Sequence, residues 1–246
     1  MNRTLIFAHR GAKREAAENT RTAFDRALVY PVDGIETDIQ LSRDGVTVLW
    51  HDDHLAKLGL PEKRIDHFDF AQLRTLNFAA HFDAATNECV MSLQEFVETY
   101  RERCRLLLEI KRYPGETEAR QQIKVRQTLE SAGDVFDGNI LVSSFDLDSV
   151  IYAHQIAPKF PLVLNLEPEH QADFAWKVLL EHPFLFGLCV HIATLDEGMV
   201  GVAREKEKFI AVYTCNSEEQ IGRALELGVD VLISDVPQKA LQMRDK

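Results

Sequence analysis

The chain has 246 residues, of which 46% are hydrophobic, and a formal net charge of −11 at pH 7. This composition is that of an ordinary soluble protein with a substantial core, and α/β barrels often use such a length as one domain. The acidic balance argues against nucleic acid and anionic membrane surfaces as main partners, although a local basic pocket can still bind a phosphate.

The chain shows no sign of export. The four cysteines are widely scattered and form no C-x-x-C pair, which favours buried, reduced thiols over disulfides. The N-terminal apolar run is too short for a signal peptide and lacks a small-residue cleavage site. Because no apolar run approaches the length of a membrane span, we expect a cytoplasmic protein without stable membrane association.

Short apolar runs alternate with amphipathic segments along the chain. Continuous apolar runs are typical of strands buried in a parallel sheet, and apolar residues at helical spacing indicate helices that cover it. The predicted strands lie at 4–8, 34–41, 105–111, 140–144, 162–166, 188–192, 209–213 and 230–234, with a short returning strand at 46–50. The predicted helices lie at 22–29, 66–76, 116–129, 147–155, 172–180, 196–207, 218–227 and 237–243.

About eight strand-then-helix units favour a (β/α)8 TIM barrel over a doubly wound sheet. No linker interrupts the pattern, so residues 1–246 are predicted to form a single domain. Residues from about 52 to 90 contain no strong buried strand and are predicted to be a small insertion after the second strand. The insertion lies on the side where barrels build active sites, so it is either a wall for the substrate or an excursion without a role.

The stretch 34–53 carries an unusual set of polar residues. Its period of two places Glu36 and Asp38 on the same face of a strand, and a turn at 43–45 sends the chain back to His51. Two carboxylates two residues apart repel each other unless a cation lies between them. The stretch by itself fits a functional site and the polar face of a surface hairpin equally well.

The barrel prediction brings these residues together with others, because the carboxyl ends of its strands meet at one mouth. The mouth is predicted to contain His9, Arg10, Glu36, Asp38, His51, Glu109 and Lys111. Such charges must neutralise each other, bind a metal or bind an anion. Three carboxylates without cysteine favour Mg²⁺ or Ca²⁺, the two cations suit a phosphate, and the histidines suit proton transfer. Each residue alone is more often structural, but together they predict phosphoester chemistry.

Seven short motifs then carry a resemblance to a known family. They are A-H-R-G at 8–11, E-N-T at 18–20, E-T-D at 36–38, H-D at 51–52, L-E-I-K at 108–111, S-F at 144–145 and G-V-D-V-L-I-S-D-V-P at 228–237. In this order they resemble the glycerophosphodiester phosphodiesterases, a metal-dependent family on a TIM barrel. The resemblance spans nearly the whole chain.

The resemblance implies roles for individual residues. His9 and His51 would be the acid/base pair, with Glu36, Asp38 and Glu109 holding a divalent cation, Mg²⁺ or Ca²⁺. Arg10 and Lys111 would bind the phosphate, and Glu18 would orient groups in the mouth. Tyr213 would form an aromatic wall at the position where the family often has tryptophan. The implied substrate is a glycerophosphodiester such as glycerophosphocholine or glycerophosphoethanolamine, cleaved to sn-glycerol 3-phosphate and an alcohol after attack by the glycerol 2-hydroxyl.

Two alternatives stay open from the sequence. A lysophospholipase D-type barrel would need an apolar rim, which Phe68, Phe70, Phe78 and Phe82 of the insertion could form unless they fill a core. The second alternative is a catalytically silent barrel that only binds a ligand. The presence of all the histidines and carboxylates proposed for the site argues against it. Whether the chain forms a homo-oligomer is left open by the sequence.

Overall fold

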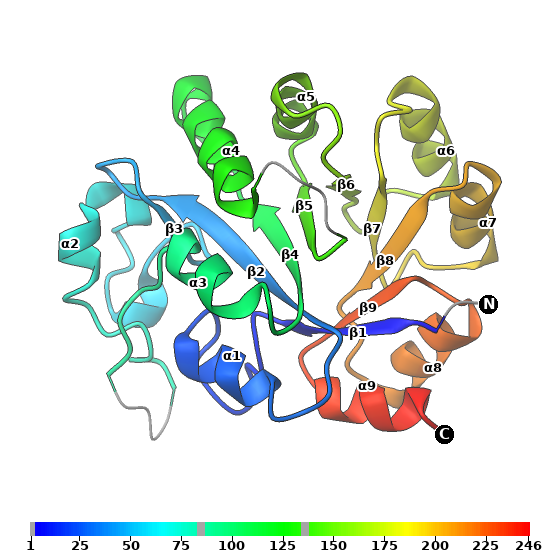
Figure 1. Ribbon diagram of the computed structural model, residues 1–246, viewed down its shortest axis with the longest axis horizontal. Helices are drawn as coiled ribbons and strands as arrows, with labels where there is room; N and C mark the ends of the chain where they lie inside the picture. Colours follow the sequence, from blue (N-terminus) through cyan, green and yellow to red (C-terminus); the bar gives the residue numbers. More distant parts are fainter. Residues whose placement is uncertain (1–2, 83–86, 134–137) are drawn as a thin grey trace.

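Parallel strands close into a barrel in the computed structural model of the protein, which describes residues 3–82, 87–133 and 138–246 (Figure 1). Within these residues the barrel strands are β1 (Leu5–His9), β2 (Gly34–Leu41), β4 (Arg105–Ile110), β5 (Ile140–Ser144), β6 (Leu162–Asn165), β7 (Gly187–His191), β8 (Phe209–Tyr213) and β9 (Val231–Ser234). Each pairs in parallel with its neighbours, and pairing of β1 with both β9 and β2 closes the ring. The predicted TIM barrel is confirmed.

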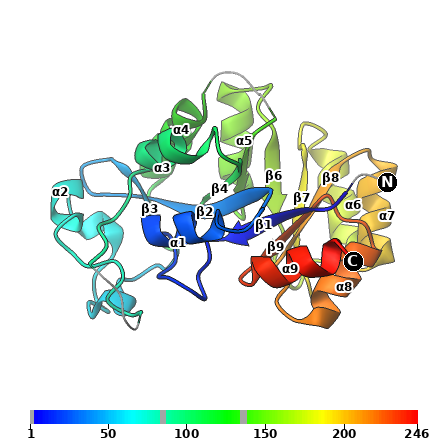
Figure 2. The ribbon, with the colours of Figure 1, turned by 60° about the horizontal axis from the view of Figure 1, so that its bottom comes forward.

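Helices surround this barrel between successive strands. They are α1 (Arg21–Ala27), α3 (Leu93–Tyr100), α4 (Glu118–Ala132), α5 (Leu147–Ile156), α6 (Ala172–Glu181), α7 (Glu197–Glu205), α8 (Glu218–Glu226) and α9 (Pro237–Arg244). The last helix, α9, packs beside β1 and β9 near the end of the chain (Figure 2). The extra strand β3 (Thr47–Leu49) runs antiparallel to the end of β2, as the predicted hairpin requires.

The sequence interpretation was wrong about helices in one region. It missed α3, although Ser92 and Glu95 form a capping box there, with the Ser92 hydroxyl accepting from the Glu95 N–H. The predicted helix at 66–76 is instead a 3-10 turn (Ile65–His67) followed by the single-turn helix α2 (Phe70–Leu73). Because α3 is the helix that returns the chain to β4, the insertion ends just before it.

The strands pack differently on their two faces. Leu106, Leu108 and Ile110 of β4 lie in the large core between barrel and helices. Leu107 points the other way, into the small core inside the barrel, which Phe7 and Val163 also fill. Because side chains alternate along a strand, Glu109 must also point inward. This agrees with the prediction that Glu109 lies at the mouth.

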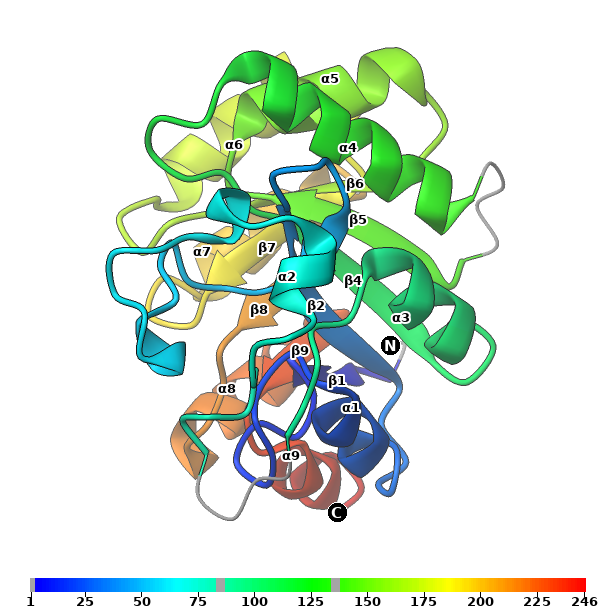
Figure 3. The same ribbon diagram turned by 90° about the vertical axis from the view of Figure 1, so that its left-hand side faces the viewer.

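The insertion has a small core of its own, beside β3 at the left of Figure 1 and facing the viewer in Figure 3. Trp50 and Phe78 are buried in it with their rings edge to face, 5.4 Å apart. Phe68 and Phe70 pack against the same cluster, which agrees with the alternative that these side chains fill a core. Phe82, the fourth phenylalanine considered for a rim, lies outside this cluster, and it is half-buried and lines a smaller hollow with Glu18 and Lys57.

The four cysteines are free, as expected, although Cys89 is exposed rather than buried. Within the described part of the chain, none of the helices has the length and apolar content needed to cross a membrane.

The packing of α1 against α3 gives a test of the core. Phe24 is fully buried, and its ring lies 4.6 Å from Phe96 and 5.5 Å from Tyr100. We expect Phe24→Ala to lower the free energy of unfolding by about 3–5 kcal/mol, because it leaves a cavity between the two helices. Urea denaturation measures this change, with Val29→Ala, at a side chain that is 71% exposed, as a control expected to stay within about 0.5 kcal/mol. A loss at Phe24 no larger than that of the control would contradict the packing described.

Candidate active site

Hollows lie at both ends of the barrel. One, with a volume of about 960 Å³, lies at the carboxyl ends of the strands, and its lining includes His51, Glu109 and Lys111. Another, of about 940 Å³, lies at the amino ends, beside Leu5 and Arg105. The first is lined by three of the residues predicted to meet at the mouth, so it is the candidate active site.

Three carboxylates meet at the edge of this hollow. Asp38 of β2 and Glu109 of β4 are direct neighbours in the parallel pairing, and Glu36 lies two residues before Asp38 on the same face. One oxygen from each lies within 4.8 Å of the others, and Glu36 and Asp38 are almost fully buried. The structure therefore brings together the three residues that the sequence predicts as metal ligands.

The charges of this cluster are not fully balanced by protein groups. Arg10 Nε lies 3.0 Å from Asp38 Oδ2, and Lys111 Nζ lies 2.7 Å from Glu109 Oε1. Burial raises the pKa of Glu36 well above its ordinary value, and repulsion from Asp38 and Glu109 raises it further. Burial acts on Asp38 in the same direction, but Arg10 and other nearby cations outweigh it, so the pKa of Asp38 lies below its usual range.

Two oxygens of the cluster lack a hydrogen-bond donor, although one of them, Asp38 Oδ1, lies 3.8 Å from Lys111 Nζ. Glu36 Oε1 and Asp38 Oδ1 are buried and accept no hydrogen bond from any described residue. Buried carboxylate oxygens without donors are costly, and a cation between them removes both this cost and the repulsion. An all-oxygen donor set of this kind fits a hard divalent cation such as Mg²⁺ or Ca²⁺. The cluster can therefore hold a metal.

His9 is held at the mouth by a residue from the far end of the chain. Its Nδ1 lies 2.6 Å from Asp235 Oδ1, and its Nε2 lies 3.8 Å from Glu36 Oε2. Asp235 is fixed in turn by Asn216 Nδ2, 2.9 Å away, and Lys13 Nζ, 3.0 Å away. Burial lowers the pKa of His9 to about 4, despite the opposing bond to Asp235. A neutral His9 that donates through Nδ1 leaves Nε2 as an acceptor.

His51 forms a second pair of the same kind. Its Nδ1 lies 2.7 Å from Asp52 Oδ1, and Lys57 Nζ from the insertion lies 2.9 Å from Asp52 Oδ2. The Gln40 side chain donates to the Asp52 carbonyl at 2.8 Å, which fixes the chain where it leaves β3. The histidine is half-buried and lines the hollow, so its Nε2 is the ring nitrogen left for a ligand.

Glu18 lies between the first loop and the insertion. It accepts from Arg10 Nη1 at 3.2 Å and from Lys57 Nζ at 2.6 Å, and these cations hold its pKa below the ordinary value although burial opposes them. Its neighbour Asn19 donates to Asp38 Oδ2 at 3.0 Å. Arg10 itself has a positive φ of 57°, an uncommon backbone conformation for a residue other than glycine that often marks functional sites.

Tyr213 forms part of the opposite wall. Its ring contacts Phe145 and His191 edge to face, with centroids 5.6 Å and 5.3 Å away. The hydroxyl donates to the Leu166 carbonyl at 2.7 Å, so its hydrogen is engaged within the protein. Every residue predicted for the site therefore lies around the mouth.

The sequence interpretation assigned no role to several residues that complete the site. Asp235 follows the last barrel strand directly, so the rule that strand ends converge could have found it. Asp52 and Asn19 lie within recognised motifs. Asn165, which donates to Glu109 Oε2 at 3.1 Å, ends β6 and could have been found by the same rule, whereas Lys57 carried no signal in the sequence.

Comparisons with known proteins agree with this geometry. The profile of the Glycerophosphoryl diester phosphodiesterase family matches residues 9–239. A glycerophosphodiester phosphodiesterase of Bacillus altitudinis is 31% identical over 254 residues, which cover 99% of each chain. One of Caldanaerobacter subterraneus is 28% identical and covers 98% of each chain.

A solved structure extends the similarity to three dimensions. A phosphodiesterase of Oleispira antarctica, in complex with the product sn-glycerol-3-phosphate, superposes with a TM-score of 0.87 at 26% identity, covering 99% of this chain and 98% of that one. The match over nearly the whole length confirms the resemblance carried by the motifs. The chain belongs to the glycerophosphoryl diester phosphodiesterase family of enzymes.

Proposed function

We propose that this protein hydrolyses small glycerophosphodiesters to sn-glycerol 3-phosphate and an alcohol in the presence of a divalent cation. The observation that carries the proposal is the buried carboxylate cluster, flanked by two histidines that are each paired with an aspartate. Family membership and the product bound to the Oleispira relative support the same substrate class. The packing of Phe68, Phe70 and Phe78 inside the insertion leaves only Phe82 of the four phenylalanines that an apolar rim for a lipid would need, which favours the small substrate.

Glu36, Asp38 and Glu109 are the residues that would hold the cation, Mg²⁺ or Ca²⁺. The buried oxygens of Glu36 and Asp38 that accept no hydrogen bond from the described residues favour a cation over a purely internal network. A bound divalent cation would polarise the phosphoryl group and offset the charge that develops on it. Arg10 and Lys111 stand beside this cluster and would orient the phosphate oxygens through their remaining N–H donors.

His9 and His51 would move the protons. One histidine takes the proton of the glycerol 2-hydroxyl as its oxygen attacks phosphorus, and the other donates a proton to the oxygen of the departing alcohol. Water then attacks the cyclic phosphate, and the same two groups act in reverse. In each pair the aspartate engages Nδ1, which leaves Nε2 to exchange the proton. Glu18 would keep Arg10 and Lys57 in place, and Tyr213 would bound the substrate.

Removal of metal tests the carboxylate cluster. We expect EDTA to abolish release of sn-glycerol 3-phosphate from glycerophosphocholine, and Mg²⁺ or Ca²⁺ to restore it. A saturating cation should also stabilise the fold, by about 2.7 kcal/mol at a concentration of about 100 Kd. Glu36→Gln should lose this stabilisation without destabilising the metal-free protein, because the substitution removes a buried and repelled carboxylate. Thermal unfolding with and without cation measures both effects, and full stabilisation of the variant would refute the assignment.

Substitution of His51 tests proton transfer separately from metal binding. We expect His51→Ala to lower kcat by at least about 100-fold, the usual scale of general acid–base catalysis. The stabilisation of the fold by the cation should be unchanged, because His51 is not one of the clustered residues that would hold it. His182→Ala, after the end of α6, is the matched control for loss of an imidazole. A variant with normal kcat would remove His51 from the mechanism.

Asp235 offers a test of how His9 is held. Asp235→Asn keeps the shape of the side chain but presents an amide to His9 Nδ1, so the imidazole loses its carboxylate partner and favours the other tautomer. We expect kcat to fall by at least about tenfold. Asp245→Asn, at an exposed aspartate paired with Arg3, is the control. Equal kcat in the two variants would show that the His9–Asp235 pair is not used.

A further inference from the structure

A lysine ammonium is buried behind the active site, in the helix that follows β4. The side chains of Lys124 in α4 and Glu116 are fully buried, and Lys124 Nζ lies 2.8 Å from Glu116 Oε2. The ammonium also donates to the Lys111 carbonyl at 2.6 Å and to Gln121 Oε1 at 3.0 Å. These three acceptors use all three of its donors. Burial lowers the pKa of Lys124 although Glu116 opposes this.

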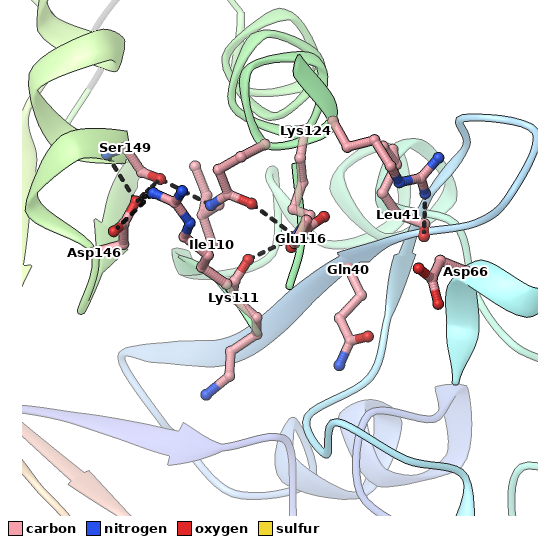
Figure 4. A network of polar contacts seen from close by, with 12 residues as sticks. Gln40, Leu41, Asp66, Ile110, Lys111, Glu116, Lys124, Asp146 and Ser149 are labelled. Atoms are coloured by element: carbon pink, nitrogen blue, oxygen red, sulfur yellow. Dashed lines mark hydrogen bonds and ion pairs between the residues drawn. The ribbon is translucent and has the colours of Figure 1, made fainter. Parts of the chain in front are cut away.

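The carbonyl that Lys124 binds belongs to a residue of the candidate site. Lys111 donates its backbone N–H to the Ile39 carbonyl at 3.1 Å, so both of its main-chain polar groups are held. Its side chain points away from Lys124, toward the mouth (Figure 4), where Nζ meets Glu109 Oε1 at 2.7 Å. The carbonyl of the preceding residue, Ile110, accepts from the Ser144 hydroxyl at 2.7 Å. The exit of β4 is therefore held by side chains of two other elements.

The loop that follows, residues 111–117, forms one wall of the hollow. Two cations lie over the ring of Tyr113 in this loop: Lys124 Nζ, 5.4 Å from its centroid, and the Arg64 guanidinium of the insertion, 4.5 Å from it. Each cation attracts the electron-rich ring. The loop is thus held between α4 and the insertion.

The same network continues to the next wall. Gln121, which accepts from Lys124, donates through Nε2 to the Ser149 hydroxyl at 2.8 Å. The Ser149 hydroxyl donates to Asp146, the cap of α5 (Figure 4). Asp146 also accepts from Arg112 at 3.0 Å and 3.1 Å. Both Arg112 and Asp146 line the hollow. One buried ammonium is therefore connected to the loops after β4 and β5.

Stability alone does not explain this arrangement. A buried ion pair is often no more stabilising than apolar residues of similar volume, because desolvation offsets the attraction. An apolar pair at these positions would, however, leave the Lys111 carbonyl without its donor. The buried Lys124–Glu116 pair has a structural reason if it fixes the conformation of the chain at Lys111.

We propose that Lys124 is a positioning residue for the reaction, which holds the Lys111 carbonyl and the 111–117 loop so that Lys111 meets the substrate phosphate. The expected change in kcat/KM rests on the proposed function. The effect of Lys124 on the conformation of the 111–117 loop does not depend on activity. Lys124 itself does not touch the substrate, because its side chain is fully buried.

The decisive variant is Lys124→Met combined with Glu116→Leu. It replaces the ion pair by apolar side chains but leaves the Lys111 carbonyl without its donor, so we expect the melting temperature to fall modestly, as for the loss of one buried hydrogen bond. We expect kcat/KM for glycerophosphocholine to fall by at least about tenfold, since small displacements of a binding group carry costs of this size. Hydrogen exchange should become faster at the amides of 111–117 and stay unchanged in β4.

Two controls separate positioning from stability. Val125→Ala, at the next and fully buried position of α4, should lower the melting temperature but leave kcat/KM close to the wild-type value. Lys177→Met removes an exposed lysine of α6 and should change neither.

The outcomes are distinct. Unchanged exchange in the loop of the double variant overturns the proposal, as does kcat/KM within about twofold of the wild type. If the double variant does not fold, Lys124→Met combined with Glu116→Gln, which leaves no buried charge and keeps a polar group at position 116, is measured by the same exchange experiment below its melting temperature. If the wild type releases no sn-glycerol 3-phosphate with any cation, the proposed function fails, whereas the exchange measurement still decides whether Lys124 holds the loop.

Discussion

Repulsion among Glu36, Asp38 and Glu109 is the constraint on which the rest of the site depends. Three carboxylates within 4.8 Å of one another, two of them almost fully buried, require compensating positive charge. Arg10 and Lys111 supply two positive charges, so three negative charges leave a deficit of one, which agrees with the raised pKa of Glu36. A divalent cation removes this deficit, and the barrel keeps the carboxylates in place because they lie on paired strands.

Layers of ion pairs around this cluster explain why so many charged residues gather at one mouth of an acidic protein. Glu18 holds Arg10, Lys57 holds Glu18 and Asp52, and Asp52 in turn orients His51. Each charged group of these outer layers thus has an opposite charge beside it. Lys57 brings the insertion into this chain of contacts, which gives that segment a structural part in the site.

Most of the architecture was predictable because strands and helices repeat with different periods. Apolar runs of four to six residues marked the barrel strands, and their boundaries agree with the structure to within a residue or two. The region around α3 was misread for an identifiable reason. Its start at Ser92 is marked by a capping box rather than by a long amphipathic pattern, and the short turns before it are set by packing around Trp50.

Alternation along β2 and β4 places Glu36, Asp38 and Glu109 on one face, so the amino-acid sequence alone predicts which side chains point into the mouth. The partners that these groups meet follow from the tertiary fold. The bond between His9 and Asp235 joins residues 226 positions apart, and that between Lys57 and Glu18 joins an insertion to a loop. Such contacts depend on barrel closure and on the path of irregular segments, which local periodicity does not encode. Nothing in the sequence distinguishes Lys124 from an exposed lysine of a surface helix. Its burial results from the packing of α4 against the end of β4.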